Sequence, residues 1–159
     1  MDEQPSQRNA EHYALKEFKG RWYLLANDTK DARIKTFGLD RISDIGISRK
    51  KFQWQKELDV DAIFKNCIGI ISATDDKAER IILSFEPLQG RYIKSFPLYE
   101  TQQVLVDNIE ELKISLHLYI THDLIMELLS YGEEVEVISP NKLIEQITGI
   151  YKNALGYYE

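Results

Sequence analysis

The feature that most constrains the fold is a strict alternation of apolar and polar residues in the second half of the chain. Leucine or isoleucine stands at every second position, namely at Leu112, Ile114, Leu116, Leu118 and Ile120. Successive side chains of a β-strand point to opposite faces, so a period of two places this whole row on one face. The stripe therefore predicts a strand in a sheet that buries one of its faces.

Around this strand, segments with helical spacing alternate with extended segments. The expected elements are a strand in 78–86, a helix in 88–96, strands in 101–108 and 111–121, a helix in 122–131, a strand in 133–139 and a final helix in 141–158. Thr121 and Asn141 are the expected N-caps of the last two helices. The order matches the ferredoxin-like βαββαβ arrangement, in which two helices cover one face of a four-stranded antiparallel sheet. The residues expected to share its core are Ile82, Phe85, Leu112, Leu116, Ile125, Leu128 and Val137.

The first half predicts shorter strands separated by polar turns. The expected elements are strands in 21–27 and 32–37, a third extended segment in 39–48, a helix in 59–67 with Asp59 as N-cap, and a strand in 68–75. Lys19-Gly20 predicts a tight hairpin turn before the first of these strands. Short strands at this spacing indicate a small barrel or a sandwich. The expected fold class is α+β, with a flexible leader in 1–12, a small barrel in 13–77 and the ferredoxin-like extension in 78–159.

Charge is distributed unevenly between the two halves. The net charge is −6, but residues 16–56 hold 11 Lys and Arg against 5 Asp and Glu, whereas residues 78–159 hold 6 against 13. A basic window of this kind predicts a patch that attracts anions. The alternative is an ordinary solvated face, because counts along a chain say nothing about clustering in space. Pairing of the acidic half of one subunit with the basic window of another would give a homodimer.

Several classes of protein are disfavoured by the residues that are missing. Cys67 is the only cysteine, which excludes an internal disulfide and fits a reducing cytoplasm. There is no apolar run long enough to span a bilayer and no secretory signal at the start. His12, His117 and His122 form no zinc-binding pair, and no phosphate loop or serine elbow is present. We therefore expect no metal, no cofactor and no catalytic residues.

The informative stretch is the basic first half, where polar residues stand among large apolar neighbours. Tyr23, Lys35 and Arg41 are of this kind. An aromatic ring flanked by cations suits an anion or a nucleobase, since the cation pairs with phosphate and the ring stacks on the base. The alternative is that Tyr23 is an amphipathic barrel residue and that Lys35 and Arg41 are ordinary surface cations.

Two stretches of sequence carry a family resemblance. The first half shows R-W-Y-L-L at 21–25 and I-K-T-F-G-L-D-R-I at 34–42. The second half shows R-I-I-L-S-F at 80–85, P-L-Y-E-T-Q at 97–102 and L-L-S-Y-G-E-E-V-E-V-I-S-P at 128–140. In this order the segments resemble the WYL domain family with its C-terminal extension, over about residues 13–150.

The resemblance implies an Sm-like, SH3-type barrel followed by a ferredoxin-like extension. It implies the ligand-sensing, non-enzymatic part of a bacterial transcriptional regulator, with nucleic-acid fragments or nucleotides among the anionic ligands. DNA contact would then belong to a helix-turn-helix that does not precede residue 13 in this chain. The competing hypothesis is a dimerisation or docking module that binds no ligand.

Position by position, the resemblance assigns ligand contact to three residues. Tyr23 belongs to W-Y-L, Lys35 falls where the family has Arg before T-F, and Arg41 falls on the Arg of D-R-I. Lysine lacks the planar fork of arginine, so bidentate phosphate recognition at Lys35 is weakened. Tyr99 and Thr101 replace a family His and Ser, so we assign that segment no ligand role.

Overall fold

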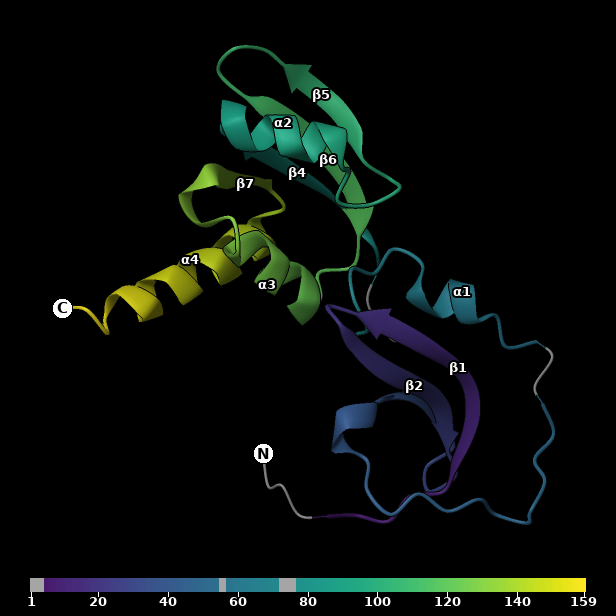
Figure 1. Ribbon diagram of the computed structural model, residues 1–159. Coiled ribbons are helices and arrows are strands. Elements are labelled where there is room, and N and C mark those ends of the chain that lie inside the picture. The colour runs from purple at the N-terminus through teal and green to yellow at the C-terminus, as the bar shows by residue number, and fades with distance from the viewer. Residues whose placement is uncertain (1–4, 55–56, 72–76) are drawn as a thin grey trace. The chain divides into compact units, whose positions relative to one another are not determined.

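The computed structural model describes residues 5–54, 57–71 and 77–159. Packing divides the chain into two compact units, Met1–Lys65 and Asn66–Glu159. Each unit has its own antiparallel sheet, one with the strand order β1-β2-β3 and the other with the order β5-β6-β4-β7 (Figure 1). The expected mixed α and β composition is therefore confirmed.

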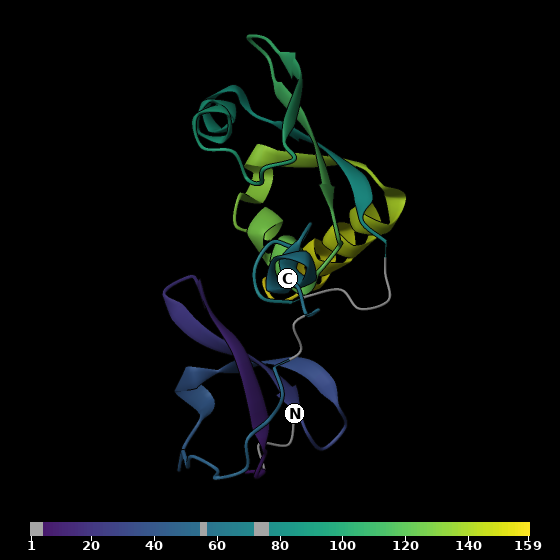
Figure 2. The same ribbon diagram turned by 90° about the vertical axis from the view of Figure 1, so that its right-hand side faces the viewer.

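The second unit follows the expected order of elements. They are β4 (Glu79–Phe85), α2 (Pro87–Ser95), β5 (Gln103–Asp107), β6 (Leu112–Leu118), α3 (His122–Leu129), a short 3-10 turn η2 (Gly132–Glu134), β7 (Val135–Ser139) and α4 (Asn141–Leu155). All three neighbouring strand pairs are antiparallel. Helices α2 and α3 lie on the same side of the sheet (Figures 1 and 2). The order thus agrees with the predicted βαββαβ succession.

The core of this unit is made by the alternating residues of the two central strands. The buried apolar side chains of β4 and β6 are Ile81, Leu83, Phe85, Leu112, Ile114, Leu116 and Leu118. Directly paired residues share a face, and the pairs Phe85–Leu112 and Leu83–Ile114 belong to this row. Gly90 of α2 packs so closely on Leu112 that a Cβ atom there would lie 2.7 Å from the Leu112 Cβ. The sheet face that carries Leu112 is therefore the one that α2 covers.

Of the residues expected in this core, Ile82 lies on the opposite face of the sheet, whereas Val137 pairs with Leu83 on the core face but lies at its edge. Ile82 is paired with Ser115, on the face opposite to Leu83, and is only half-buried. Val137 lies on the edge strand β7 and is also half-buried, because an edge strand has a neighbour on one side alone. The prediction was wrong for Ile82 because β4 is apolar on both faces at that point. Composition therefore does not reveal on which face of the sheet the Ile82 side chain lies.

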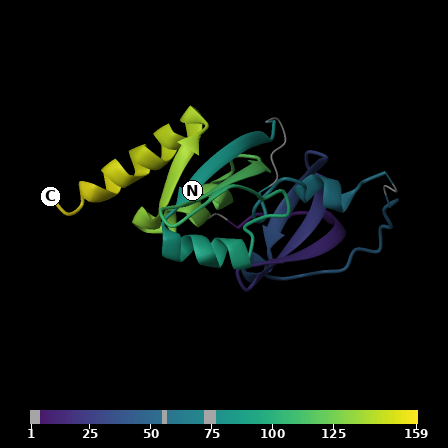
Figure 3. The same ribbon diagram turned by 90° about the horizontal axis from the view of Figure 1, so that it is seen from above.

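The helix ends of the second unit confirm one predicted cap and correct another. The Thr121 hydroxyl accepts a hydrogen bond from the Leu124 N–H at the start of α3, as expected. At α4 the N-cap is Pro140 and Asn141 is already helical, so the prediction of Asn141 as cap was wrong by one position. Helix α4 contacts β7 and extends past the edge of the sheet (Figure 3).

The first unit is built on a β-hairpin that starts earlier than expected. Strand β1 (Ala10–Phe18) pairs with β2 (Arg21–Asp28), which pairs in turn with β3 (Arg33–Gly38). The turn at Lys19-Gly20 is confirmed, with φ of 49° and 74° as a tight hairpin turn requires. The last three residues of the predicted leader in 1–12 belong to β1, because Ala10, Glu11 and His12 pair with the end of β2.

A closed barrel is not formed by the residues that the structure describes. Segment 39–48, predicted as extended, begins with a 3-10 turn η1 (Leu39–Arg41) and then has no regular structure, and Ile47 is 98% exposed. Residues 68–70 of the second predicted strand form bends and residue 71 has no regular structure, while 72–75 lie outside the described residues. The prediction of extended structure for 39–48 was wrong because, within the described segments, no strand pairs with these residues.

A small apolar cluster stabilises the first unit. Tyr13, Leu25 and Phe64 are buried together, with Ile34 and Phe52 packed partly against them. Phe64 comes from α1 (Val60–Phe64), whose predicted N-cap is confirmed by two hydrogen bonds to the Asp59 carboxylate, from the N–H groups of Asp61 and Ala62. The short helix therefore closes one face of the three-stranded sheet.

Candidate functional site

The register of β2 and β3 decides which of the predicted ligand residues can meet. Tyr23 is directly opposite Gly38, whereas Lys35 is directly opposite Ala26. Tyr23 and Ala26 are three positions apart on one strand, so their side chains point to opposite faces. Tyr23 and Lys35 therefore lie on opposite faces of the sheet. The expectation that Tyr23, Lys35 and Arg41 line one pocket is thus wrong for Lys35.

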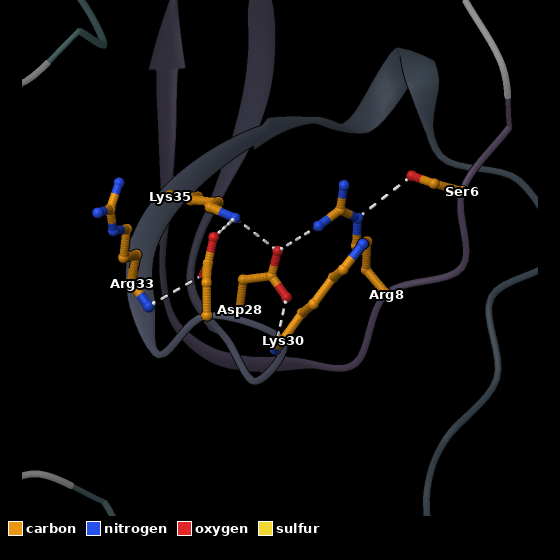
Figure 4. A network of polar contacts seen from close by, with 7 residues as sticks. Ser6, Arg8, Asp28, Lys30, Arg33 and Lys35 are labelled. Carbon is orange, nitrogen blue, oxygen red and sulfur yellow. Dashed lines mark hydrogen bonds and ion pairs between the residues drawn. The ribbon is translucent and has the colours of Figure 1, made fainter.

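Lys35 is held in a network of charged groups around Asp28 (Figure 4). Its Nζ atom lies 2.8 Å from Asp28 Oδ2 and also donates to the Asp31 carboxylate. Arg8 Nη1 lies 2.9 Å from the same Asp28 oxygen, and the Lys30 backbone N–H donates to Oδ1. Two carboxylates thus compensate the Lys35 charge, which weakens its attraction for an external anion.

The protonation equilibria of this network favour the charged forms. The hydrogen bond from Lys35, helped by the Lys30 backbone N–H and by the charges of Lys35 and Arg8, lowers the pKa of Asp28 to about 2. The Lys35 hydrogen bond lowers the pKa of Asp31 as well, and the bonds to Asp28 and Asp31 raise the pKa of Lys35. Through their bonds to Asp28 and Asp31, Arg8 and Lys35 connect the segment before β1 with the turn between β2 and β3.

Tyr23 has a different set of neighbours on the face of the sheet that it occupies. Lys16 of β1 is its direct cross-strand partner, and the Lys16 Nζ atom lies 3.9 Å from the centroid of the Phe64 ring. On the other side is Gly38, where a Cβ atom would lie 3.7 Å from the Tyr23 ring. The half-buried phenol ring thus lies between a cation-bearing strand and a residue without a side chain.

Arg41 reaches the same end of the sheet through η1. This turn contacts β2, and Asp40 within it forms an ion pair of 3.6 Å with Arg21. The Arg41 side chain is exposed, and no ion pair or hydrogen bond engages it in the described part of the chain. The structure therefore places Tyr23 beside the element that carries Arg41, and places Lys35 elsewhere.

Lys16 is the functional candidate that the sequence interpretation overlooked. A two-residue turn at Lys19-Gly20 pairs Phe18 with Arg21, so counting back along the hairpin pairs Lys16 with Tyr23. The sequence analysis predicted the turn but did not use it to pair the residues before Lys19 with those of β2. The signal was therefore present in the sequence.

Two family models match the chain in succession. The WYL domain model matches residues 1–47, and the WCX domain model matches residues 77–155. Residues 1–47 therefore form a WYL domain, and residues 77–155 form a WCX domain. The WYL domain holds β1, β2, β3 and η1, and the WCX domain holds the second sheet with α2, α3 and α4.

The chain is also similar to a solved structure, the proteasome accessory factor B/C (PafBC) of Arthrobacter aurescens. The two are 20% identical, the match covers 88% of this chain and 21% of that chain, and the TM-score is 0.35. The chain thus spans about a fifth of the length of that protein. A search of curated proteins finds no match.

In the WCX domain, Tyr99 and Thr101 have hydrogen-bond partners within the chain. The Tyr99 hydroxyl accepts a hydrogen bond from the Asn66 N–H at 2.9 Å, and burial raises the pKa of Tyr99. Thr101 Oγ1 bonds to the backbone of His117. Both observations account for these residues without a ligand.

The segment that precedes the WCX domain is bound to it. The Asp123 carboxylate accepts hydrogen bonds from the N–H groups of Ile70 and Ile71, at 2.9 and 3.1 Å. The Tyr119 N–H donates to the Asn66 carbonyl at 2.8 Å. These bonds explain why packing assigns residues 66–71 to the second unit.

The described residues contain no group of three or more His, Cys, Asp or Glu side chains placed to hold a metal ion. Among the helices of the described segments, none has the length and apolar character needed to cross a bilayer.

Proposed function

We propose that this chain is the ligand-sensing module of a bacterial transcriptional regulator and that it binds an anionic ligand without catalysis. The observation that carries the proposal is the position of Tyr23 of the W-Y-L strand, between Lys16 on β1 and the turn that bears Arg41. A ring next to cations suits a phosphate-bearing ligand. Succession of a WYL and a WCX domain supports the regulatory context.

Within this proposal, Tyr23 and Arg41 contact the ligand and Lys16 adds positive charge. Lys35 takes a supporting role, because Asp28 and Asp31 already bind its ammonium group. We assign the WCX domain to the ferredoxin-like class on its strand order β5-β6-β4-β7, and the WYL domain to an open relative of the SH3-like barrels. Signalling requires that the ligand favour one of two packing states of a homodimer.

The test is a titration of the full chain with a six-nucleotide single-stranded DNA at several salt concentrations. Affinity should fall as salt rises, because each phosphate contact releases counterions. Arg41→Ala should weaken binding and reduce the salt slope by about one. Arg91→Ala, which removes an exposed arginine of α2, is the matched control and should leave both unchanged. Binding that is insensitive to salt or to Arg41→Ala would contradict the proposal.

A second candidate function is a docking or dimerisation module that binds no ligand. It is favoured by the apolar residues Leu15 and Trp22, which are exposed on the sheet face opposite to Leu25. Its signature would be self-association that Trp22→Ser abolishes, together with no binding of any single-stranded oligonucleotide. Light scattering across a concentration series separates this outcome from the first.

A further inference from the structure

The WYL domain contains an aromatic cluster that the Tyr23 site does not use. The ring centroids of Tyr13 and Trp54 are 4.9 Å apart, and Phe52 lies 6.1 Å from Tyr13 and 6.5 Å from Trp54. His12 meets Phe52 edge-on at 5.4 Å. A break in the register of β1 between His12 and Ala14 leaves Tyr13 without a cross-strand partner. Such a bulge aims neighbouring side chains in directions that a regular strand does not permit.

The two ends of this cluster differ in exposure. The Trp54 side chain is 51% exposed, so part of the indole is open to stacking, whereas Tyr13 is only 7% exposed. The Tyr13 hydroxyl is buried and has no hydrogen-bond partner among the described residues. A buried hydroxyl without a partner is unfavourable, because it has lost its bonds to water. The Trp54 ring packs against the Tyr13 ring, so a change in the position of Trp54 would alter the surroundings of Tyr13.

Positive charge lies directly beside the cluster in the chain. Arg49, Lys50 and Lys51 immediately precede Phe52 and are all exposed. Their charged groups take part in no ion pair or hydrogen bond within the described segments. Cations next to an exposed aromatic ring are the combination with which proteins hold single-stranded nucleic acids and nucleotides.

We propose that Tyr13, Phe52 and Trp54 form a second binding site, for an anionic ligand that carries a flat heteroaromatic ring. The ring stacks on Trp54, the phosphate meets Arg49, Lys50 and Lys51, and the Tyr13 hydroxyl bonds to the polar edge of the ring when Trp54 turns aside. The ligand class rests on the proposed function, whereas the location rests on the cluster itself. A free nucleotide and a single-stranded nucleic acid share this chemistry.

The two tryptophans provide a matched fluorescence test in the full chain. Trp22 and Trp54 are about equally exposed, at 50% and 51%, and both lie in the first unit. Hexathymidylate and thymidine monophosphate are the two ring-bearing probes, and tripolyphosphate is the ring-free anion. Stacking on Trp54 should quench its fluorescence, so quenching should persist in Trp22→Phe and disappear in Trp54→Phe. Quenching by the mononucleotide identifies the nucleotide as sufficient, and quenching by hexathymidylate alone identifies the strand as the ligand.

Tyr13→Phe separates a binding role from a packing role. It removes the unpartnered hydroxyl and leaves the ring, so the free energy of unfolding should stay equal or rise. Affinity for the quenching probe should nevertheless fall by about three- to tenfold, the value of one neutral hydrogen bond. A merely structural tyrosine would show no change in affinity, which would overturn the role of the hydroxyl.

The other outcomes distinguish this inference from the proposed function. Two results would overturn the inference. One is that tripolyphosphate binds as tightly as hexathymidylate, and the other is that the probes still quench the fluorescence of Trp54→Phe. If Arg41→Ala abolishes binding while Tyr13→Phe and Trp54→Phe bind normally, the Tyr23 site stands and this site does not exist. If the reverse holds, the aromatic cluster is the ligand site and the assignment of Arg41 fails.

Discussion

The two sheets of this protein show the same alternation of apolar residues but bury it to different degrees. In the second unit, α2 and α3 cover one face, and the alternate residues of β4 and β6 on that face are buried. In the first unit, one face packs on the small cluster around Leu25, while Leu15 and Trp22 on the other face stay exposed. Alternation thus specifies a strand, but a core forms only where another element covers the face.

The largest expected effect breaks the core of the second unit. Leu83→Ala in β4 empties a fully buried position, which should lower the free energy of unfolding by about 3 kcal/mol. Urea denaturation followed by circular dichroism measures it. Leu15→Ala in β1 removes a side chain that is exposed, and should change stability by less than about 0.5 kcal/mol. Equal losses would mean that a partner covers Leu15.

The next effect concerns the segment that joins the second unit. Gly69 has a φ of +88°, and a Cβ atom there would lie 2.3 Å from the Asp123 carboxylate. Gly69→Ala should therefore destabilise the second unit by about 2 kcal/mol, from the strained backbone and the displaced carboxylate. Circular dichroism of thermal unfolding measures the loss.

Gly20 provides the control for this substitution. It has a similar φ of +74° but open space around it, so Gly20→Ala has the backbone penalty alone, about 1 kcal/mol. If the two substitutions lowered the free energy of unfolding equally, the close contact with Asp123 would contribute nothing to the loss at Gly69.

A smaller, pH-dependent effect is expected in the first unit. The pKa of Asp28 is about 2 in the folded chain against an ordinary value of 3.8. A lowered folded-state pKa gives stabilisation that is complete above the ordinary value and is lost as the pH falls toward 2. Both tryptophans lie in this unit, so their fluorescence during urea unfolding reports its stability at each pH.

Asp28→Asn tests the origin of that dependence. The amide cannot be deprotonated, so the variant should be less stable at neutral pH and should lose less stability on acidification than the original chain. Glu111→Gln is the matched control in the second unit, where hydrogen bonds from Ser84 and Lys113 lower the pKa of the carboxylate. An unchanged acid response of tryptophan fluorescence in Asp28→Asn would show that the network does not stabilise the first sheet.

The smallest expected effect on stability is at the open face of the first sheet. Trp22→Ser removes a half-exposed indole and should change the free energy of unfolding by less than about 0.5 kcal/mol. Trp54 fluorescence and light scattering follow the variant. A large loss of unfolding free energy that grows with protein concentration would instead show that a second copy covers this face. Both sheets would then have their apolar faces covered, and the difference between them would disappear.

Most of the second unit could be predicted from the sequence because its signals are local. The stripe from Leu112 to Leu118, the cap at Thr121 and the order of helices and strands need only neighbouring residues for their recognition. The sheet face of Ile82 could not be predicted, because the neighbouring Ile81 is also apolar and lies on the opposite face. The pairing of Ile82 with Ser115 in β6 determines the face on which its side chain lies.

The sequence by itself determined the hairpin turn at Lys19-Gly20 and the strand containing Tyr23, since turn chemistry and alternation act over a few residues. Only the tertiary structure decided that Lys35 turns away from Tyr23 toward Asp28, and that Tyr13 and Trp54 meet. The physical reason is register. Strand pairing determines the sheet face on which a side chain lies. Contacts between residues far apart in the sequence depend on the path of the chain between them.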